Sequence, residues 1–248
     1  MAYNYTTYQS YLATMMATTT ADTYFQTILP MCIDYAEQRI YRELDLLNTR
    51  ARDSSIACTP GTRLVTLVST LVVLETLAAI TPAGSTPSAG KRNVLIPVTH
   101  DYIDLVYPNE SGSTYQDLPK FYAMLTAQGV NSGGANVGAS VLLGPSPDQA
   151  YVLESVGTFR PAPLTALNAN TVLTALLPDL FMAASMIFMS GFQKNFGAQA
   201  DDPKMSQSWE SQYQTLMMSA KTEEFRKKYE ASSWSSMIRP ETADKARG

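Results

Sequence analysis

The sequence predicts an α+β fold: an antiparallel bundle of four helices, drawn from both chain ends, with a central β-rich insertion. Three observations support this prediction. Apolar residues recur with helical spacing before residue 50 and again after residue 166. Between these regions the chain is rich in β-branched residues and is broken by Pro and Gly. The last 17 residues, 232–248, show no periodicity and are predicted to form an extended tail.

Two helices are expected before residue 50. The first has a short amphipathic stripe, made of Tyr8, Tyr11, Leu12, Met15 and Met16, with Thr6 or Thr7 as its cap. The second has a longer apolar face, made of Phe25, Ile28, Leu29, Cys32, Ala36, Ile40, Leu44 and Leu47. Pro30 lies inside this second pattern, where a proline either kinks a helix or marks its first turn.

The central region is expected to contain short strands separated by turns. The candidate strands are residues 63–68, 72–80, 92–98, 121–126, 140–143 and 150–158. Turn signals occur at residues 59–61, 82–84, 131–134 and 144–147, and residues 99–107 fit a short helix. The predicted domains are therefore a helical bundle (1–50 and 166–231), a β-rich insertion (51–165) and a C-terminal tail (232–248).

Two more helices are expected after the insertion. Residues 173–192 approach the length of a membrane span, but Pro178 and Asp179 lie near the start, and neither end residue of the segment is basic. We interpret this segment as a buried core helix and expect no membrane association. Asp202 and Pro203 then form a strong start signal, an N-cap followed by Pro, for a helix that runs to about Glu230.

Composition excludes several classes of protein. The 18 Lys and Arg and 22 Asp and Glu give a formal net charge of −4, and no basic block is present to bind nucleic-acid phosphates. One histidine and two cysteines exclude zinc fingers and disulfide frameworks, and we expect both cysteines to be reduced and buried. No signal peptide is recognised at the N-terminus. Charged residues make up only 16%, against about 25% in average proteins, which suggests a surface that other subunits cover.

Catalytic patterns are weak. His100 is the single imidazole, and no Gly-x-Ser-x-Gly nucleophile elbow occurs. The loop that contains Gly133, Gly134 and Gly138 has no Lys-Ser/Thr of a phosphate-binding motif. The candidate acids of the insertion are scattered: Asp101, Asp104, Glu110 and Asp117. We therefore expect no enzymatic activity, cofactor or metal, and keep a carboxylate-based glycan hydrolase as a minor alternative.

Methionines on the third main helix allow two interpretations. Met182, Met186 and Met189 recur at i, i+4 and i+7. Methionine packs adaptably in cores, so the three residues fit the interior of the bundle. They equally fit a second apolar face that contacts a neighbouring subunit, which the low charge favours, and they are predicted as interface residues on that basis.

Several segments together resemble one family. Residues 25–44 (FQTILPMCIDYAEQRIYREL) resemble the signature helix of tailed-phage head-to-tail adaptor proteins of the podovirus type. Residues 118–123 (LPKFYA), 142–151 (LLGPSPDQAY) and 176–188 (LLPDLFMAASMIF) resemble later family motifs, in the same order. The resemblance runs from about residue 8 to about residue 231. The departures are extra residues at 54–57, the glycine-rich loop at 130–137, and Asn170-Thr171-Val172 where the family usually has Thr-Trp.

The resemblance implies a structural virion protein of the phage neck. Such an adaptor forms a ring, typically of twelve copies, below the portal protein, and nozzle or other tail proteins dock beneath it. Packaged double-stranded DNA passes through the lumen without sequence-specific binding, and the C-terminal extension reaches the portal. The portal-binding residues expected here are Ser232, Ser233, Trp234, Met237, Ile238 and Arg239. A stopper or tail-completion protein of the neck is the alternative.

Overall fold

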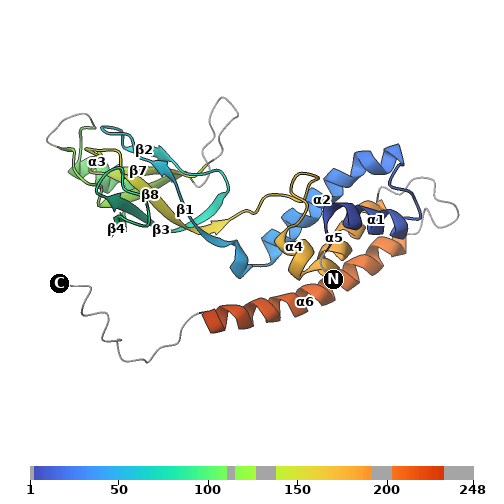
Figure 1. Cartoon of the computed structure of the whole chain (residues 1–248). Helices are drawn as coiled ribbons and strands as arrows, with labels where there is room; N and C mark the ends of the chain where they lie inside the picture. The colour runs from blue at the N-terminus through green and yellow to red at the C-terminus, as the bar shows by residue number, and fades with distance from the viewer. Residues whose placement is uncertain (1–2, 111–114, 127–137, 192–202, 232–248) are drawn as a thin grey trace. The chain divides into compact units, whose positions relative to one another are not determined.

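The computed structural model describes residues 3–110, 115–126, 138–191 and 203–231, and it confirms the predicted α+β class (Figure 1). The chain divides into two compact units, residues 1–47 with 162–248 and residues 48–161. The first unit is helical and the second carries the strands. Each unit has its own hydrophobic core.

The helical unit begins with α1 (Tyr5–Met15) and α2 (Thr23–Glu43). Asn4 caps α1 instead of the predicted threonines, because its side chain accepts a hydrogen bond from the Thr7 N–H at 2.8 Å. Asp22 caps α2. Helix α2 continues through Pro30, so the proline does not mark the start of the helix.

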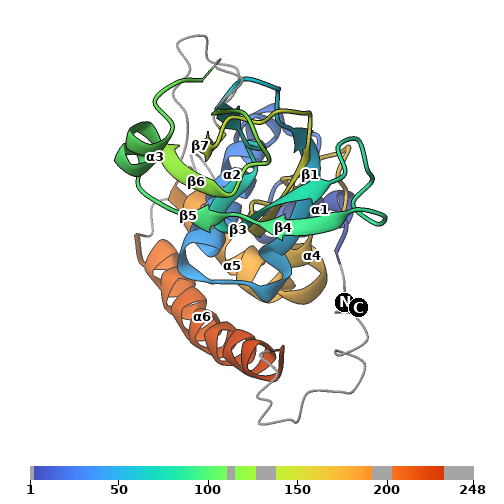
Figure 2. The same cartoon turned by 90° about the vertical axis from the view of Figure 1, so that its left-hand side faces the viewer.

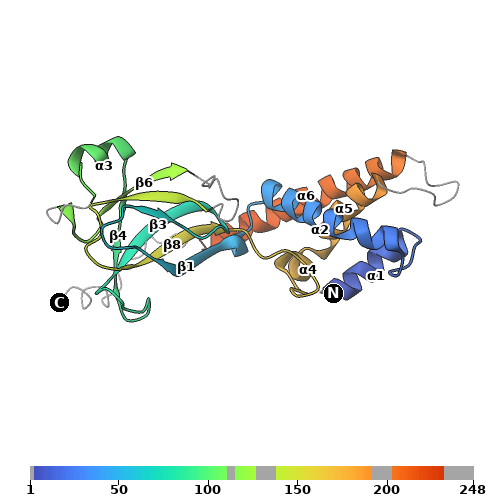
Figure 3. The same ribbon diagram turned by 90° about the horizontal axis from the view of Figure 1, so that it is seen from above.

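Residues after the strands supply α4 (Val172–Leu176), α5 (Pro178–Gly191) and α6 (Pro203–Ala231). The chain breaks at Leu177 and α5 restarts at Pro178, since proline fits the first turn of a helix. Helix α5 packs against both α2 and α6, as Figure 3 shows from above. The predicted end of α6 near residue 230 is confirmed.

Aromatic packing fixes α1 on α5. The ring of Tyr8 stacks on that of Phe181 with 4.7 Å between centroids. The Tyr8 hydroxyl lies 2.7 Å from the Ser185 hydroxyl and donates to the Phe181 carbonyl at 3.0 Å. Burial raises the pKa of Tyr8 far above its ordinary value. The hydroxyl therefore stays protonated and serves as a buried structural donor.

The strand-bearing unit consists of two four-stranded sheets (Figure 2). A 3-10 turn, η1 (Leu47–Thr49), precedes the first strand. The elements are β1 (Arg50–Ala57), β2 (Leu64–Thr66), β3 (Leu71–Thr81), β4 (Lys91–Val94), β5 (Ile96–Pro97), α3 (His100–Val106), β6 (Phe121–Thr126), β7 (Ser140–Gly144) and β8 (Val152–Phe159). The first sheet has the order β1-β8-β3-β4 and is antiparallel; the second has the order β2-β7-β6-β5, with β5 parallel to β6. Their shared core includes Leu77, Leu95, Tyr122, Val141, Leu143 and Leu153.

Most predicted strands are confirmed, with two differences. The predicted strand 92–98 divides at buried Leu95, so β4 joins one sheet and β5 the other. Strand β1 was not predicted. The turns at 59–61 and 82–84 are confirmed by Gly61 and Gly84, whose φ angles of 72° and 76° favour glycine. The predicted turn at 131–134 lies outside the described residues.

Candidate interaction surfaces

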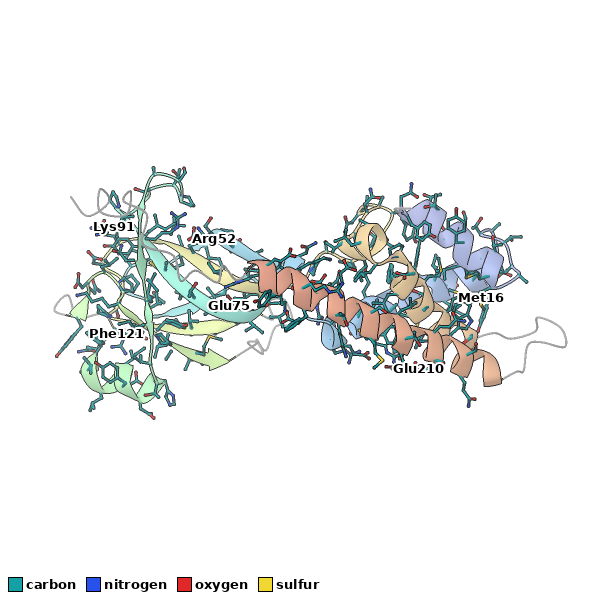
Figure 4. All side chains as sticks on the ribbon, turned by 90° about the horizontal axis from the view of Figure 1, so that it is seen from below. Met16, Arg52, Glu75, Lys91, Phe121 and Glu210 are labelled. Atoms are coloured by element: carbon teal, nitrogen blue, oxygen red, sulfur yellow. The ribbon has the colours of Figure 1, made fainter. Side chains whose placement is uncertain are left out.

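Helix α6 is held to α2 by a network around Arg39. The guanidinium of Arg39 donates to both carboxylate oxygens of Glu210, at 2.8 and 2.6 Å, and to Glu43 at 2.9 Å. It also lies 4.2 Å from the ring centre of Tyr213, whose hydroxyl donates to Glu43 at 3.0 Å. The hydrogen bond from Arg39 holds the pKa of Glu210 below its usual value. Figure 4 labels Glu210 on α6.

Two buried carboxylates hold the chain where it leaves and re-enters the helical unit. Glu224 of α6 accepts a hydrogen bond from the Leu47 N–H at 3.0 Å, and Leu47 is the last residue before the chain enters the strand-bearing unit. Glu37 of α2 accepts from the Leu164 N–H at 3.0 Å, just after the chain returns. Burial raises the pKa of Glu37 to about 7. Both crossing segments are therefore anchored by side chains.

The last turns of α6 add further contacts to the outgoing segment. Lys228 forms an ion pair with Asp45, and Lys227 pairs with Glu224 at 2.8 Å. Residues 224–228 thus bind residues 45–47 and lie immediately before the predicted tail. The end of α6 therefore contacts the residues that lead into the strands.

The outward side of α6 carries an exposed apolar row. Met218, Phe225 and Tyr229 are 72%, 71% and 61% exposed, and their spacing of seven and four places them on one stripe. We call these three residues the α6 ridge. Exposed Lys221 and Arg226 flank it. Another side of the helix is buried in the helical core through Tyr213, Met217 and Ala220.

A second exposed apolar cluster lies on α3 of the other unit. Leu105 is 82% exposed, and Tyr102 and Val106 are also exposed. We call these three residues the α3 patch. Tyr102 packs edge-on against Phe121 of β6, with 5.7 Å between ring centroids; Figure 4 labels Phe121. Buried Ile103 holds the opposite side of α3 in the fold.

Acidic residues accompany the α3 patch. Asp101 is 85% exposed at the start of α3, and Asp104 pairs with buried Arg63 at 3.3 Å. The α6 ridge is thus apolar with basic flanks, whereas the α3 patch is apolar with acidic flanks.

The first sheet carries an ion network around one buried carboxylate. Buried Glu154 of β8 accepts from Arg92 of β4 at 2.7 and 3.0 Å and lies 3.4 Å from Arg52 of β1. The bond from Arg92 lowers the pKa of Glu154. The network joins three strands and serves the fold.

The predicted catalytic candidates do not converge. His100 is exposed and its Nε2 lies 3.1 Å from its neighbour Asp101. Asp104 pairs with Arg63 and Asp117 with Lys120. Across the described ranges, no group of three or more His, Cys, Asp or Glu could hold a metal ion. The two cysteines are free and buried, as predicted.

Two glycine-loop candidates, Gly133 and Gly134, lie outside the described residues. At Gly138 a Cβ atom would lie 2.1 Å from the Leu67 carbonyl oxygen. A close approach of two backbones therefore accounts for this glycine.

The predicted interface methionines require a correction. Met182, Met186 and Met189 are all buried in the core of their own helical unit. Helix α5 is covered on more than one side, since it packs against α2 and α6, and this gives it apolar residues on most of its surface. In this structure none of the three presents a face to a neighbouring subunit. Core packing, the other interpretation, accounts for them.

The predicted portal-binding residues, Ser232, Ser233, Trp234, Met237, Ile238 and Arg239, lie outside the described residues, as does the predicted cap Asp202. Sequence reasoning missed the anchors Glu37, Arg39 and Glu224. Glu37 follows Ala36 directly, and Glu224 lies one helical turn after Ala220, so each acidic residue lies next to an apolar stripe. An acidic residue in such a place is the signal that could have identified them.

Comparison with known families decides the identity. The SU10 adaptor protein family matches residues 3–240, nearly the whole chain. The chain belongs to this family. Membership supports the prediction that the chain is a phage adaptor with a structural role between the head and tail of the virion. No curated protein matches the sequence. Among the helices of the described residues, none is both long and apolar enough to cross a membrane.

Proposed function

We propose that this SU10-family adaptor forms a ring on the portal, connects the capsid to the tail and lines part of the DNA conduit. The observation that carries the proposal is the family match over residues 3–240. The low charged fraction supports it, because the subunits of a ring cover much of one another's surface. In the virion neck, the portal is the partner on one side and nozzle or other tail proteins dock on the other.

Each part of the chain has a role in this proposal. Residues 1–50 and 166–231 form the antiparallel helical bundle, residues 51–165 form the β-rich insertion, and residues 232–248 form an extended tail. The contacts of α5 with α2 and α6 support the bundle. The copy number proposed is twelve, as is typical of adaptors that the sequence resembles.

The tail is proposed to bind the portal. The family match extends to residue 240, so Ser232 through Arg239 lie within the matched range. Trp234, Met237, Ile238 and Arg239 are residue types that anchor segments that fold on binding. Seventeen extended residues reach about 58 Å. Glu224 and Lys228 hold the last turns of α6, from which the tail would start.

The acidic charge suits a conduit. Each copy carries a formal net charge of −4, and a ring multiplies this value. An acidic lumen repels DNA phosphates and allows the duplex to slide without sequence-specific contacts. The proposal therefore includes passage of DNA, not recognition of it.

A pull-down with purified portal protein tests the tail. We expect deletion of residues 232–248, or Trp234, Met237 and Ile238 all changed to Ala, to abolish binding of a chain that remains folded by circular dichroism. Ser232→Ala with Ser233→Ala is the matched control, because it alters the same segment without removing apolar anchors. Portal binding by the deletion variant would contradict the tail assignment. Binding to another adaptor but not to portal would identify a stopper or tail-completion protein instead.

A further inference from the structure

We propose that the α6 ridge of one copy docks on the α3 patch of the next copy. This inference rests on the proposed ring and names the contact that would build it. A closed ring of identical subunits needs two different surfaces on every copy, each fitting the other. The structure offers two candidate surfaces for this contact: the α6 ridge in the helical unit and the α3 patch in the strand-bearing unit.

Two members of the α6 ridge, Met218 and Phe225, lie outside the core of their own unit. Phe225 and Met218 lie on a different side of α6 from the buried Tyr213 and Met217. More than two thirds of each side chain is exposed, so neither contributes much to folding. Large apolar side chains grouped on one exposed stripe are typical of protein contact sites.

The α3 patch is equally unexplained by folding. A helix of seven residues is too short to be stable alone, and Ile103 with the Arg63–Asp104 ion pair holds it in place. Leu105 nevertheless points to solvent. The fold therefore presents an anchored short helix with Leu105 outward, as a docking surface does.

The charges that flank the two surfaces indicate which partner each surface binds. Lys221 and Arg226 flank the α6 ridge and form no ion pair with another described residue. Asp101 beside the α3 patch is 85% exposed, and its carboxylate lies 3.1 Å from Nε2 of the neighbouring His100. Apolar surfaces with opposite flanking charges attract one another, whereas two copies of the same surface repel. The α6 ridge should therefore dock on an α3 patch and not on another α6 ridge. A second copy of this chain supplies the complementary surface.

Disulfide trapping tests the contact between copies. Lys221→Cys is prepared in one batch and Asp101→Cys in another, and the two are mixed on portal rings under a mild oxidant. Native Cys32 and Cys58 are buried and do not interfere. We expect a cross-linked pair of chains only in the mixture. The absence of a mixed pair on a ring that forms normally would overturn the inference. A chain that carries both Lys221→Cys and Asp101→Cys and forms only an internal disulfide would also overturn it.

Charge reversal gives a second test. We expect Lys221→Glu with Arg226→Glu to weaken ring formation on the portal at least about tenfold, and Asp101→Lys in the same chain to restore it. Leu105→Asp should abolish the ring, while Leu167→Asp, at a fully exposed leucine elsewhere, should not. Unchanged rings in the ridge and patch variants would overturn the inference alone. Failure of the unmodified chain to form a ring would overturn the proposed function together with it.

Discussion

The carboxylate of Glu224, near the end of α6, accepts a hydrogen bond from the backbone N–H of Leu47 at 3.0 Å. These residues lie 177 positions apart, and Leu47 is the last residue of its segment before the strands begin. Because Glu224 is buried, water does not readily replace this bond. The bond therefore makes the position of the crossing segment depend on the docking of α6.

Removal of this acceptor should destabilise the helical unit. We expect Glu224→Ala to lower the free energy of unfolding by about 1–3 kcal/mol, since a buried N–H loses its partner. Glu224→Gln keeps an acceptor oxygen and should lose less. Urea unfolding followed by circular dichroism measures both. Equal stability of Glu224→Ala and the unmodified chain would show that the bond contributes nothing.

The buried carboxyl of Glu37 should make stability depend on pH. Its pKa of about 7 in the folded chain exceeds the ordinary value of 4.5, which applies when the chain unfolds. Between these values the folded chain binds more protons, so the free energy of unfolding falls as the pH rises from about 4.5 to about 7. Burial of the charge is the cause.

Glu37→Gln isolates this effect. Glutamine stays neutral and keeps an oxygen for the Leu164 N–H, so we expect the variant to be more stable at pH 8 by about 1–3 kcal/mol. The difference should vanish near pH 4. Glu230→Gln, at an exposed position of α6, is the control. A constant difference between pH 4 and pH 8 would contradict the assignment.

The link between α2 and α6 should require arginine at position 39. Lysine keeps the charge but cannot donate to both oxygens of Glu210 while covering the Tyr213 ring. We expect Arg39→Lys to cost about 1–2 kcal/mol and to increase hydrogen exchange in α6. A double-mutant cycle with Glu210→Gln should show coupling. Strict additivity would mean that the two side chains act independently.

Introduction of a charge should destabilise the protein at a methionine of α5 but not at one of α6. Met186 is fully buried, so Met186→Glu should lower the free energy of unfolding by about 3 kcal/mol or more. Met218→Glu, on the α6 ridge, should change it by less than about 0.5 kcal/mol. Thermal unfolding of both variants provides the comparison. Similar losses in the two would contradict the placement of these side chains.

Periodicity predicted the helices and most strands because each element shows its own local pattern. Residues 121–126, with apolar and aromatic character, form β6 with the predicted bounds. Strand β1 was missed because its sequence RARDSSIA is polar and largely exposed, and long-range pairing with β8 creates it. The order of strands within the sheets depends on such pairings, which no local pattern encodes.

The candidate sites were harder to predict than the fold. Met182, Met186 and Met189 share a stripe, but a stripe does not reveal whether its partner is the same chain or another one. Glu37 and Glu224 became visible only when Leu164 and Leu47 were seen beside them, far away in sequence. The α3 patch depends on which side of a seven-residue helix faces the sheet.

The mass of the complex with portal protein tests the central claim most directly. Native mass spectrometry or mass photometry of portal rings mixed with excess adaptor should show one step to a complex carrying many adaptor copies, twelve in the proposal. The step should be absent with the Leu105→Asp variant and present with Leu167→Asp. A portal that gains no mass, or gains single copies without a closed ring, would contradict the account of this protein as a ring-forming adaptor.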